Sequence, residues 1–246
     1  MNRSRNPDPV DGYPERLDVP TRVPKTKEEC EHYARYRWAS QMVRGEALDI
    51  ACGTGYGARL LARSARVTGV DRDEDAVDKA RARVTGRFLG AAVPPIPFPD
   101  ETFDFVVCFE TVEHIADDLE FIREIRRVLR VGGELLISTP NKDISASSGV
   151  SLNEWHVREY TLPSLKELLR NAGLELGDVY AQSFPPKLKR AHRVMWRLHG
   201  LTWTQPAVVR SVTRSLFGDA EVRPFDSHRP APGYWLVRAT RAKNYA

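Results

Sequence analysis

The sequence has few cysteines and no long apolar run, and each shortage excludes a class of protein. Its cysteines, Cys30, Cys52 and Cys108, are odd in number and widely spaced, which fits neither a disulfide framework nor a zinc knuckle and predicts reduced thiols. No run of eighteen apolar residues occurs, so we expect no membrane-spanning helix. The first twenty residues are polar and proline-rich and lack the apolar core of a signal peptide, so we expect a cytoplasmic protein.

Basic charge is concentrated near the C-terminus. Residues 183–246 contain 12 Lys and Arg against 3 Asp and Glu, a net charge of +9, and this leaves −5 for residues 1–182 of a chain whose total is +4. Such a region could meet an anionic substrate, a nucleic acid or a membrane surface, or it could be a solvated helical lid. The sequence leaves these alternatives open.

Apolar strands alternate with helical stretches along most of the chain. ALDI, VTGVD, FDFVVCF and ELLISTPN are nearly all apolar, and the segments between them have the pattern of helices. We expect helices over residues 27–43 and over DDLEFIREIRRVLRVGG, the latter ending at the C-cap glycines Gly132 and Gly133. Buried strands that alternate with helices predict an α/β fold, a Rossmann-like doubly wound, mostly parallel sheet with helices on both faces.

The same pattern divides the chain into four parts. Residues 1–26 are predicted to be an extended N-terminal arm, and residues 27–182 an N-terminal helical segment and the core. Residues 183–230 are predicted to be a basic helical lid or insertion before the last strand. Residues 231–246 contain GYWLVRAT, the final strand of the core, and a tail.

The stretch ALDIACGTGYG has the form of a cofactor-binding turn. An apolar strand ends near Asp49, and Gly53 and Gly55 follow in a turn that leads into a helix. Glycine permits a positive φ and lets a ligand approach the backbone closely. Asp71 ends the next strand, where a carboxylate can accept both hydroxyls of an adenosine ribose.

With these motifs the sequence resembles the class I S-adenosylmethionine-dependent methyltransferases, of the methyltransferase type 11 kind. LDIACGTG and GVD match the first two motifs, and PFPDETFDFVVCFETVEHI and EIRRVLRVGGELLISTPN look like the later ones, over roughly residues 28–182. The resemblance implies an enzyme that binds S-adenosylmethionine. It assigns cofactor contacts to Asp49 (methionine ammonium), Gly53 and Gly55 (methionine and ribose), Asp71 (ribose hydroxyls) and Phe109 (flank of the cofactor).

Two other segments bear on the same cofactor. Where relatives usually carry an Asp for the adenine amino group, this chain reads GAAVPPIPF, so Ala91 and Ala92 offer only backbone and the contact must come from main chain, water or elsewhere. HYARYRWA resembles a segment of bacterial relatives that modify sugars and glycans, and Tyr36 and Arg37 could close over the cofactor carboxylate. Alternatively, this helix packs its aromatic residues on the sheet.

The stretch FETVEHIADD places Glu110, Glu113 and His114 directly after the strand FDFVVCF. If a helix begins after Phe109, the three side chains project from one face, at the end of the sheet where α/β proteins hold ligands. They are either the solvated first turn of a helix, favoured there by the helix dipole, or a site that needs a cation or substrate to offset its charge.

A second element, SLNEWHVREYT, carries His156 ahead of a glutamate, an aromatic residue and a threonine. Together with ExxEH it resembles the small-RNA 3′-terminal 2′-O-methyltransferases, and ExxEH is shared with the ubiquinone-pathway O-methyltransferases. The resemblance implies a metal site held by Glu110, Glu113, His114 and His156. Mixed oxygen and imidazole ligands suit Mg²⁺ or Mn²⁺.

A divalent cation would lower the pKa of an acceptor hydroxyl, which is otherwise a poor nucleophile. Our leading hypothesis is therefore an O-methyltransferase acting on a sugar, glycoside or related small natural product, with His156, His114 and Glu113 as catalytic residues. His156 is the natural general base if it is not a ligand, and Trp155 could stack on a sugar. The alternatives are a metal-independent N-methyltransferase acting on an aminosugar or other amine, and an RNA-end 2′-O-methyltransferase or RNA-binding protein.

Overall fold

The computed structural model describes residues 27–145, 155–182, 222–229 and 231–242 of the 246-residue chain. Its helices are α1 (Lys27–Ala39), α2 (Tyr56–Leu61), α3 (Glu74–Arg83), the 3-10 helix η1 (Val112–His114), α4 (Asp118–Val128), α5 (Lys142–Ser145) and α6 (Leu162–Asn171). Its strands are β1 (Gly45–Ile50), β2 (Ala65–Asp71), β3 (Arg87–Gly90), β4 (Phe103–Phe109), β5 (Leu129–Pro140), β6 (Glu175–Gln182), β7 (Arg223–Pro224) and β8 (Tyr234–Thr240).

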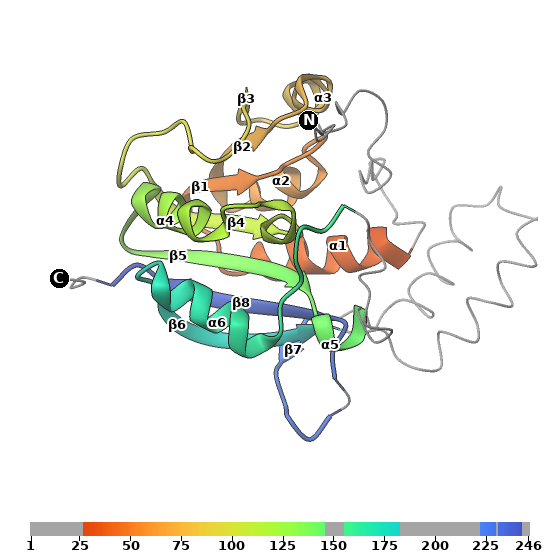
Figure 1. The fold of residues 1–246 in the computed structure, drawn as a ribbon. Helices are drawn as coiled ribbons and strands as arrows, with labels where there is room; N and C mark the ends of the chain where they lie inside the picture. The colour runs from red at the N-terminus through yellow and green to blue at the C-terminus, as the bar shows by residue number, and fades with distance from the viewer. Residues whose placement is uncertain (1–26, 146–154, 183–221, 230, 243–246) are drawn as a thin grey trace, which may run out of the picture.

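The described strands form one sheet in the order β3-β2-β1-β4-β5-β8-β6-β7 (Figure 1). Strands β1 to β5 run parallel, and β8 runs antiparallel between β5 and β6. The chain reverses direction across the sheet between β1 and β4, because β2 and β3 lie on one side of β1 and the later strands on the other. Open α/β sheets bind their ligands at such a switch point, beyond the carboxyl ends of the strands.

Helices cover both faces of the sheet. In Figure 1, α4 and α6 lie on the face nearer the viewer, and their Phe121 and Leu165 pack with Leu48 of β1 in one buried cluster. Helices α1, α2 and α3 pack against the other face, where Ala58 joins a second cluster with Ala47 of β1. The predicted doubly wound α/β fold is confirmed. No helix among the described residues is both long and apolar enough to cross a bilayer.

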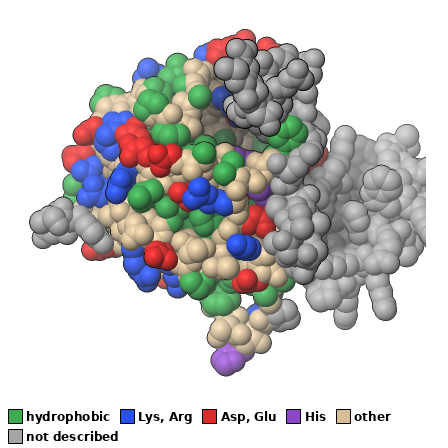
Figure 2. Space-filling view, in the orientation of Figure 1, with side chains coloured by type: hydrophobic (Ala, Val, Ile, Leu, Met, Phe, Trp, Pro, Cys, Tyr) green, Lys and Arg blue, Asp and Glu red, His purple; other side chains and the backbone are tan. Residues whose placement is uncertain are grey.

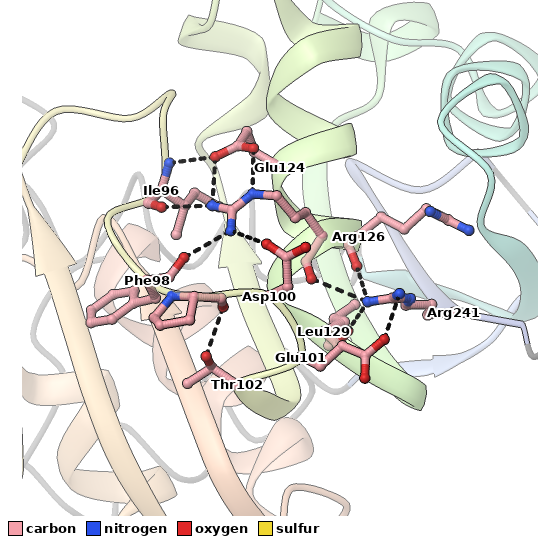
Figure 3. A network of polar contacts seen from close by, with 11 residues as sticks. Ile96, Phe98, Asp100, Glu101, Thr102, Glu124, Arg126, Leu129 and Arg241 are labelled. Carbon is pink, nitrogen blue, oxygen red and sulfur yellow. Dashed lines mark hydrogen bonds and ion pairs between the residues drawn. The ribbon is translucent and has the colours of Figure 1, made fainter.

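Helix α4 ends before the glycines that the sequence suggested as its cap. The chain is already extended at Leu129, and Gly132 and Gly133 lie inside β5, so that prediction is wrong. The physical reason is a distant residue: the Arg241 guanidinium donates to carbonyls at the end of α4 and to that of Leu129, the last at 2.6 Å (Figure 3). These bonds satisfy acceptors that a helix C-terminus leaves unpaired.

Helix α1 is also shorter than predicted. It ends at Ala39, and the expected helix over residues 27–43 continues only as turns. The Arg44 side chain binds the carbonyls of Ser40, Gln41 and Val43, and this gives the turn its own hydrogen bonds. The arm 1–26 and residues 183–221 of the predicted basic lid or insertion lie outside the described residues, so the division into four parts stays a prediction.

Candidate active site

The turn between β1 and α2 contains the predicted glycines. Gly53 has a φ of 51° and Gly55 a φ of 79°, both in the left-handed region that favours glycine. A Cβ atom on Gly53 would meet no atom within 4 Å, so open space borders the backbone there. A Cβ atom on Gly55 would lie 2.8 Å from the Cβ atom of Ala80, so this glycine lets α2 pack closely on α3. Gly53 faces open space, whereas Gly55 supports the packing beneath the turn.

Asp71, the last residue of β2, lies at the same turn. Its Oδ2 accepts a hydrogen bond from the backbone N–H of Gly53 at 2.8 Å, and its Oδ1 accepts one from that of Asp73 at 3.0 Å. Strands β1 and β2 are parallel neighbours, so the end of β2 comes beside the turn that follows β1. The ribose contact of Asp71 stays a prediction, and the position beside Gly53 is the one it requires.

Asp49 of β1 is fully buried just before the turn. The Tyr36 hydroxyl donates to its Oδ1 at 2.9 Å, and its Oδ2 is buried with no hydrogen-bond partner. Burial is the main reason that the pKa of Asp49 is raised to about 7; the bond from Tyr36 opposes this rise and the charge of Asp71 adds to it. A cationic group that reached the second oxygen would stabilise the ionised form.

Tyr36 joins α1 to this region. Its ring packs edge-on against Phe109 with 5.1 Å between the ring centroids, and a Cβ atom on Gly57 would overlap the Tyr36 ring. The helix therefore packs its aromatic residues on the sheet, and the bond to Asp49 also brings Tyr36 to the predicted cofactor site. Arg37, expected to close over the cofactor with Tyr36, is exposed, and its contact with the cofactor stays a prediction. One residue along a helix turns a side chain by about 100°, which points Arg37 to solvent.

The arginine that does face inward is Arg35, which no pattern in the sequence indicates. Its side chain is fully buried, its Nη1 donates to Gln182 at 2.8 Å, and its Cζ lies 4.4 Å from the ring centre of Tyr234. Nε and Nη2 have no hydrogen-bond partner, although Nη2 lies 3.9 Å from Glu110. Burial opposes the charge of Arg35, but the surrounding acidic groups, Glu110 first, raise its pKa overall. This cation retains donors for an anion.

Glu110 does not belong to the group of ligand atoms that the other three predicted metal ligands form. Its backbone N–H donates to the Ser138 carbonyl at 3.1 Å, and its carboxylate accepts from the Ser138 hydroxyl at 2.8 Å. Its φ of 50° and the short η1 replace the helix assumed to begin after Phe109, so the predicted one-face spacing is wrong. The reason is the backbone hydrogen bond to Ser138 of β5, which ties Glu110 to the sheet in a bend just after β4 ends. Glu110 therefore faces Ser138 and Arg35.

The other three predicted metal ligands meet. Potential ligand atoms of Glu113, His114 and His156 lie within 4.8 Å of one another, and the histidine rings stack edge-on with centroids 4.9 Å apart. Glu113 is fully buried; its Oε2 accepts from the Thr139 hydroxyl at 3.1 Å, and its Oε1 has no hydrogen-bond partner. Burial, and then the charge of Glu110, raises the pKa of Glu113.

Residues 155–160 bring His156 to this cluster through bonds to η1 and α4. The backbone N–H of Val157 donates to the Glu113 carbonyl at 2.9 Å. Arg158 and the Tyr160 hydroxyl both donate to Asp118, at 2.6 and 2.7 Å. These contacts fix the segment on both sides of His156.

The cluster has the composition of a divalent cation site. A carboxylate and two imidazoles suit Mn²⁺ or a similar ion, and the orphaned Glu113 Oε1 is an oxygen donor in need of a positive partner. His114 and His156 are intermediate in exposure as residues, although the His156 side chain is only 8% exposed. Some histidine surface is present on the face of the molecule drawn in Figure 2. The composition of the cluster therefore fits a cation.

Ala92 lies in the loop after β3, which α4 holds in place. Arg127 donates to the carbonyls of Ile96 and Phe98 at 2.9 and 2.8 Å, and Glu124 accepts from the Ile96 backbone N–H at 2.9 Å (Figure 3). Ala92 itself is exposed, as a backbone contact to an adenine would require. Its role stays a prediction.

The chain resembles known proteins in sequence. A family model described as "Methyltransferase domain" matches residues 48–137. A probable S-adenosylmethionine-dependent methyltransferase of Mycolicibacterium smegmatis is 41% identical over 145 residues, 58% of this chain and 56% of the relative. A ubiquinone biosynthesis O-methyltransferase of Pseudomonas aeruginosa is 30% identical over 164 residues, 58% of this chain and 70% of the relative. The chain spans about half the length of the mycobacterial relatives that it matches.

Solved structures share the fold at low sequence identity. A possible histamine N-methyltransferase of Thermotoga maritima aligns with a TM-score of 0.61 at 19% identity, over 85% of this chain and 89% of that one. The YcgJ protein of Bacillus subtilis aligns with a TM-score of 0.58 at 19% identity, over 87% and 100%. At these identities the structures bear on the fold alone.

Proposed function

Because the chain belongs to the S-adenosylmethionine-dependent methyltransferases, we propose that it methylates a hydroxyl group with the help of a divalent cation held by Glu113, His114 and His156. The observation that carries the proposal is the buried, unpartnered oxygen of Glu113 beside two histidines at the carboxyl end of β4. Glu110, which faces Arg35 and Ser138, is left out of the ligand set.

The cofactor is held by the turn after β1 and its neighbours. Gly53 leaves open space for it, Asp71 accepts the ribose hydroxyls and Ala92 meets the adenine through its backbone. Asp49 uses its unpartnered Oδ2 for the methionine ammonium, and Arg35 uses Nε and Nη2 for the methionine carboxylate. When bound, S-adenosylmethionine supplies an electrophilic methyl group on its sulfonium. Phe109 and Tyr36 bound the site on the α1 side.

The chain's own residues prepare the acceptor. A bound divalent cation would lower the pKa of an acceptor hydroxyl, as it does for water. Glu113 and the two histidines would hold that cation near the end of β4, and alignment with the methyl group follows from their fixed positions. If His156 is not a ligand, its imidazole can take the hydroxyl proton as general base.

We expect the acceptor to be a sugar, a glycoside or a related small natural product. Two adjacent hydroxyls can chelate a cation, and Trp155, 37% exposed beside His156, offers an aromatic face on which a sugar can stack. The relation to an enzyme named as an O-methyltransferase supports oxygen over nitrogen as the methylated atom.

Metal removal tests this function. Chelator-treated protein is assayed for S-adenosylhomocysteine release with methyl glycosides, an aminosugar and an RNA with a 3′-terminal ribose as acceptors. We expect transfer to a hydroxyl acceptor that is lost without metal and restored by Mg²⁺ or Mn²⁺. Glu113→Gln should abolish the rescue, whereas Glu120→Gln, at an exposed position on α4, should keep it.

Two outcomes would contradict the proposal. Full activity after metal removal would exclude the cation, and transfer to the aminosugar alone would support the amine alternative. Transfer to the RNA would keep the chemistry but replace the small-molecule acceptor. Residues 183–221, a large part of the basic region that suggested nucleic acid, lie outside the described residues.

A further inference from the structure

Glu159 has no role in the function proposed above, yet its side chain is only 4% exposed and lies against His156. Its Oε1 is 3.1 Å from the Nδ1 atom of His156, and its Oε2 accepts from the Ser145 hydroxyl at 2.5 Å. Burying a carboxylate is costly unless it is hydrogen-bonded and offset by other contacts. Holding residues 155–160 in place does not require it, because Asp118 already binds Arg158 and Tyr160.

The second histidine of the cluster shows what such a contact does. The Nδ1 atom of His114 lies 3.0 Å from the Trp155 carbonyl oxygen. A carbonyl oxygen can only accept, so a neutral His114 carries its proton on Nδ1 and its lone pair on Nε2. An ionised Glu159 is also only an acceptor, and it imposes the same arrangement on His156.

We propose that Glu159 is a positioning residue that fixes the ring of His156 with its proton on Nδ1 and its lone pair on Nε2. In both histidines of the cluster, an acceptor then holds the proton on Nδ1, and the lone pair of Nε2 is left for a metal ion. The consequence for metal binding rests on the proposed function. Acceptors behind histidine ligands typically contribute about 10–100-fold to metal affinity.

A different role for Glu159 is to tether α5 to residues 155–160 through Ser145. The two roles separate by mutation. Ser145→Ala removes the tether and leaves the contact with His156, whereas Glu159→Ala removes both. Glu159→Gln keeps an amide oxygen that can still accept from Nδ1, so it preserves the shape of the site if the alanine variant folds poorly.

The experiment begins with metal-free protein, in which long-range proton–nitrogen correlation spectra report the tautomer of each neutral histidine. We expect the Nδ1–H form for His156 in the native chain and in Ser145→Ala, retention in Glu159→Gln, and a shift toward the Nε2–H form in Glu159→Ala. His114 is an internal control, because its acceptor is a backbone carbonyl that none of these variants removes. Calorimetry with Mn²⁺ should then show about 10–100-fold weaker binding for Glu159→Ala, and nearly native binding for Ser145→Ala.

An unchanged His156 tautomer in Glu159→Ala would overturn the inference, and so would an equal loss of Mn²⁺ affinity in Ser145→Ala. Affinity for S-adenosylhomocysteine and the melting temperature verify that each variant is folded. A tautomer shift in a protein that binds no Mn²⁺ at all would support the positioning role and contradict the proposed function. The failures of the two proposals are therefore distinguishable.

Discussion

The proposed cofactor side and the proposed acceptor side of the site are assembled in different ways. The centre of the cofactor side consists of one strand, the turn that follows it and Asp71 at the end of the neighbouring strand, and the parallel pairing of β1 and β2 brings these three parts together. The acceptor side joins η1 to residues 155–160, which are held by hydrogen bonds to Glu113 and Asp118. The first depends on strand pairing in the sheet. The second depends on the hydrogen bonds that attach residues 155–160 to Asp118 and Glu113.

Because the two sides are built from different contacts, we expect a mutation on one side to change the binding of Mn²⁺ or of S-adenosylhomocysteine without changing the other. Removing a ligand should affect only the acceptor side. We expect Glu113→Gln to weaken Mn²⁺ binding by more than the about 10–100-fold typical of outer contacts, because it replaces the buried oxygen donor. Affinity for S-adenosylhomocysteine, measured by calorimetry in the same samples, should stay native. A parallel loss of both affinities would show that the two sides of the site are not independent.

The matching change on the cofactor side is Asp71→Asn. It removes a charged acceptor, whose hydrogen bonds contribute about 1.5–3 kcal/mol each, so we expect S-adenosylhomocysteine to bind about 10–100-fold more weakly. Mn²⁺ affinity should not change. Asp73→Asn, which alters the N-cap of α3 without touching the turn, is the control and should bind the product normally. Unaltered product binding in Asp71→Asn would exclude its ribose contact.

The burial of Asp49 predicts a pH dependence on the cofactor side alone. With a pKa raised to about 7, Asp49 must lose a proton to meet an ammonium group, so S-adenosylhomocysteine affinity should rise with pH and level off above about 7. Between pH 7 and pH 6 the loss should be about fivefold, and below pH 6 it approaches the limit for one linked proton, about tenfold per pH unit. Asp49→Asn should remove the slope, and an unchanged slope in that variant would exclude Asp49 as its source.

The raised pKa of Asp49 also predicts how the folding stability depends on pH. An unfolded Asp titrates near pH 4, so between about pH 4 and 7 the native protein holds a proton that the unfolded chain releases. The contribution of Asp49 to folding stability is therefore present below about pH 4 and lost as the pH rises through about 7. Urea unfolding of the cofactor-free protein and of Asp49→Asn across this range measures the difference.

The smallest expected effect on Mn²⁺ affinity comes from the hydrogen bonds between Asp118 and residues 155–160. Asp118→Asn weakens the bonds from Arg158 and Tyr160 but leaves the backbone contacts of Val157 in place. We expect Mn²⁺ to bind about threefold to tenfold more weakly, below the about 10–100-fold of a direct outer partner. Product affinity should remain native. A loss as large as that of Glu113→Gln would mean that the bonds to Asp118, and not the ligands themselves, determine the affinity for Mn²⁺.

The contrast also explains what the sequence could predict. The glycine turn and Asp71 were predictable because strand ends and turns are local patterns that a parallel sheet brings together. The mutual approach of Glu113, His114 and His156 was foreseen only through a family resemblance, since no local pattern places residues 155–160 on η1. The course of the chain at Glu110 was not predictable, because it depends on pairing with Ser138 of β5.

The burial of Arg35 is a second feature that could not be predicted from the sequence. It lies in a helix rich in charged and aromatic residues, beside an exposed arginine, and nothing in the spacing distinguishes the two. Its burial depends on Gln182 and Tyr234, which come from β6 and β8 near the end of the chain. Only the complete sheet, with β8 inserted between β5 and β6, brings these partners over α1.

The most direct test of the account is an anomalous difference map from crystals grown with S-adenosylhomocysteine and saturating Mn²⁺. We expect a manganese peak bounded by Glu113, His114 and His156, on the side of the site that faces the sulfur atom of the product. Ordered side chains around an empty position, with the product bound, would contradict it.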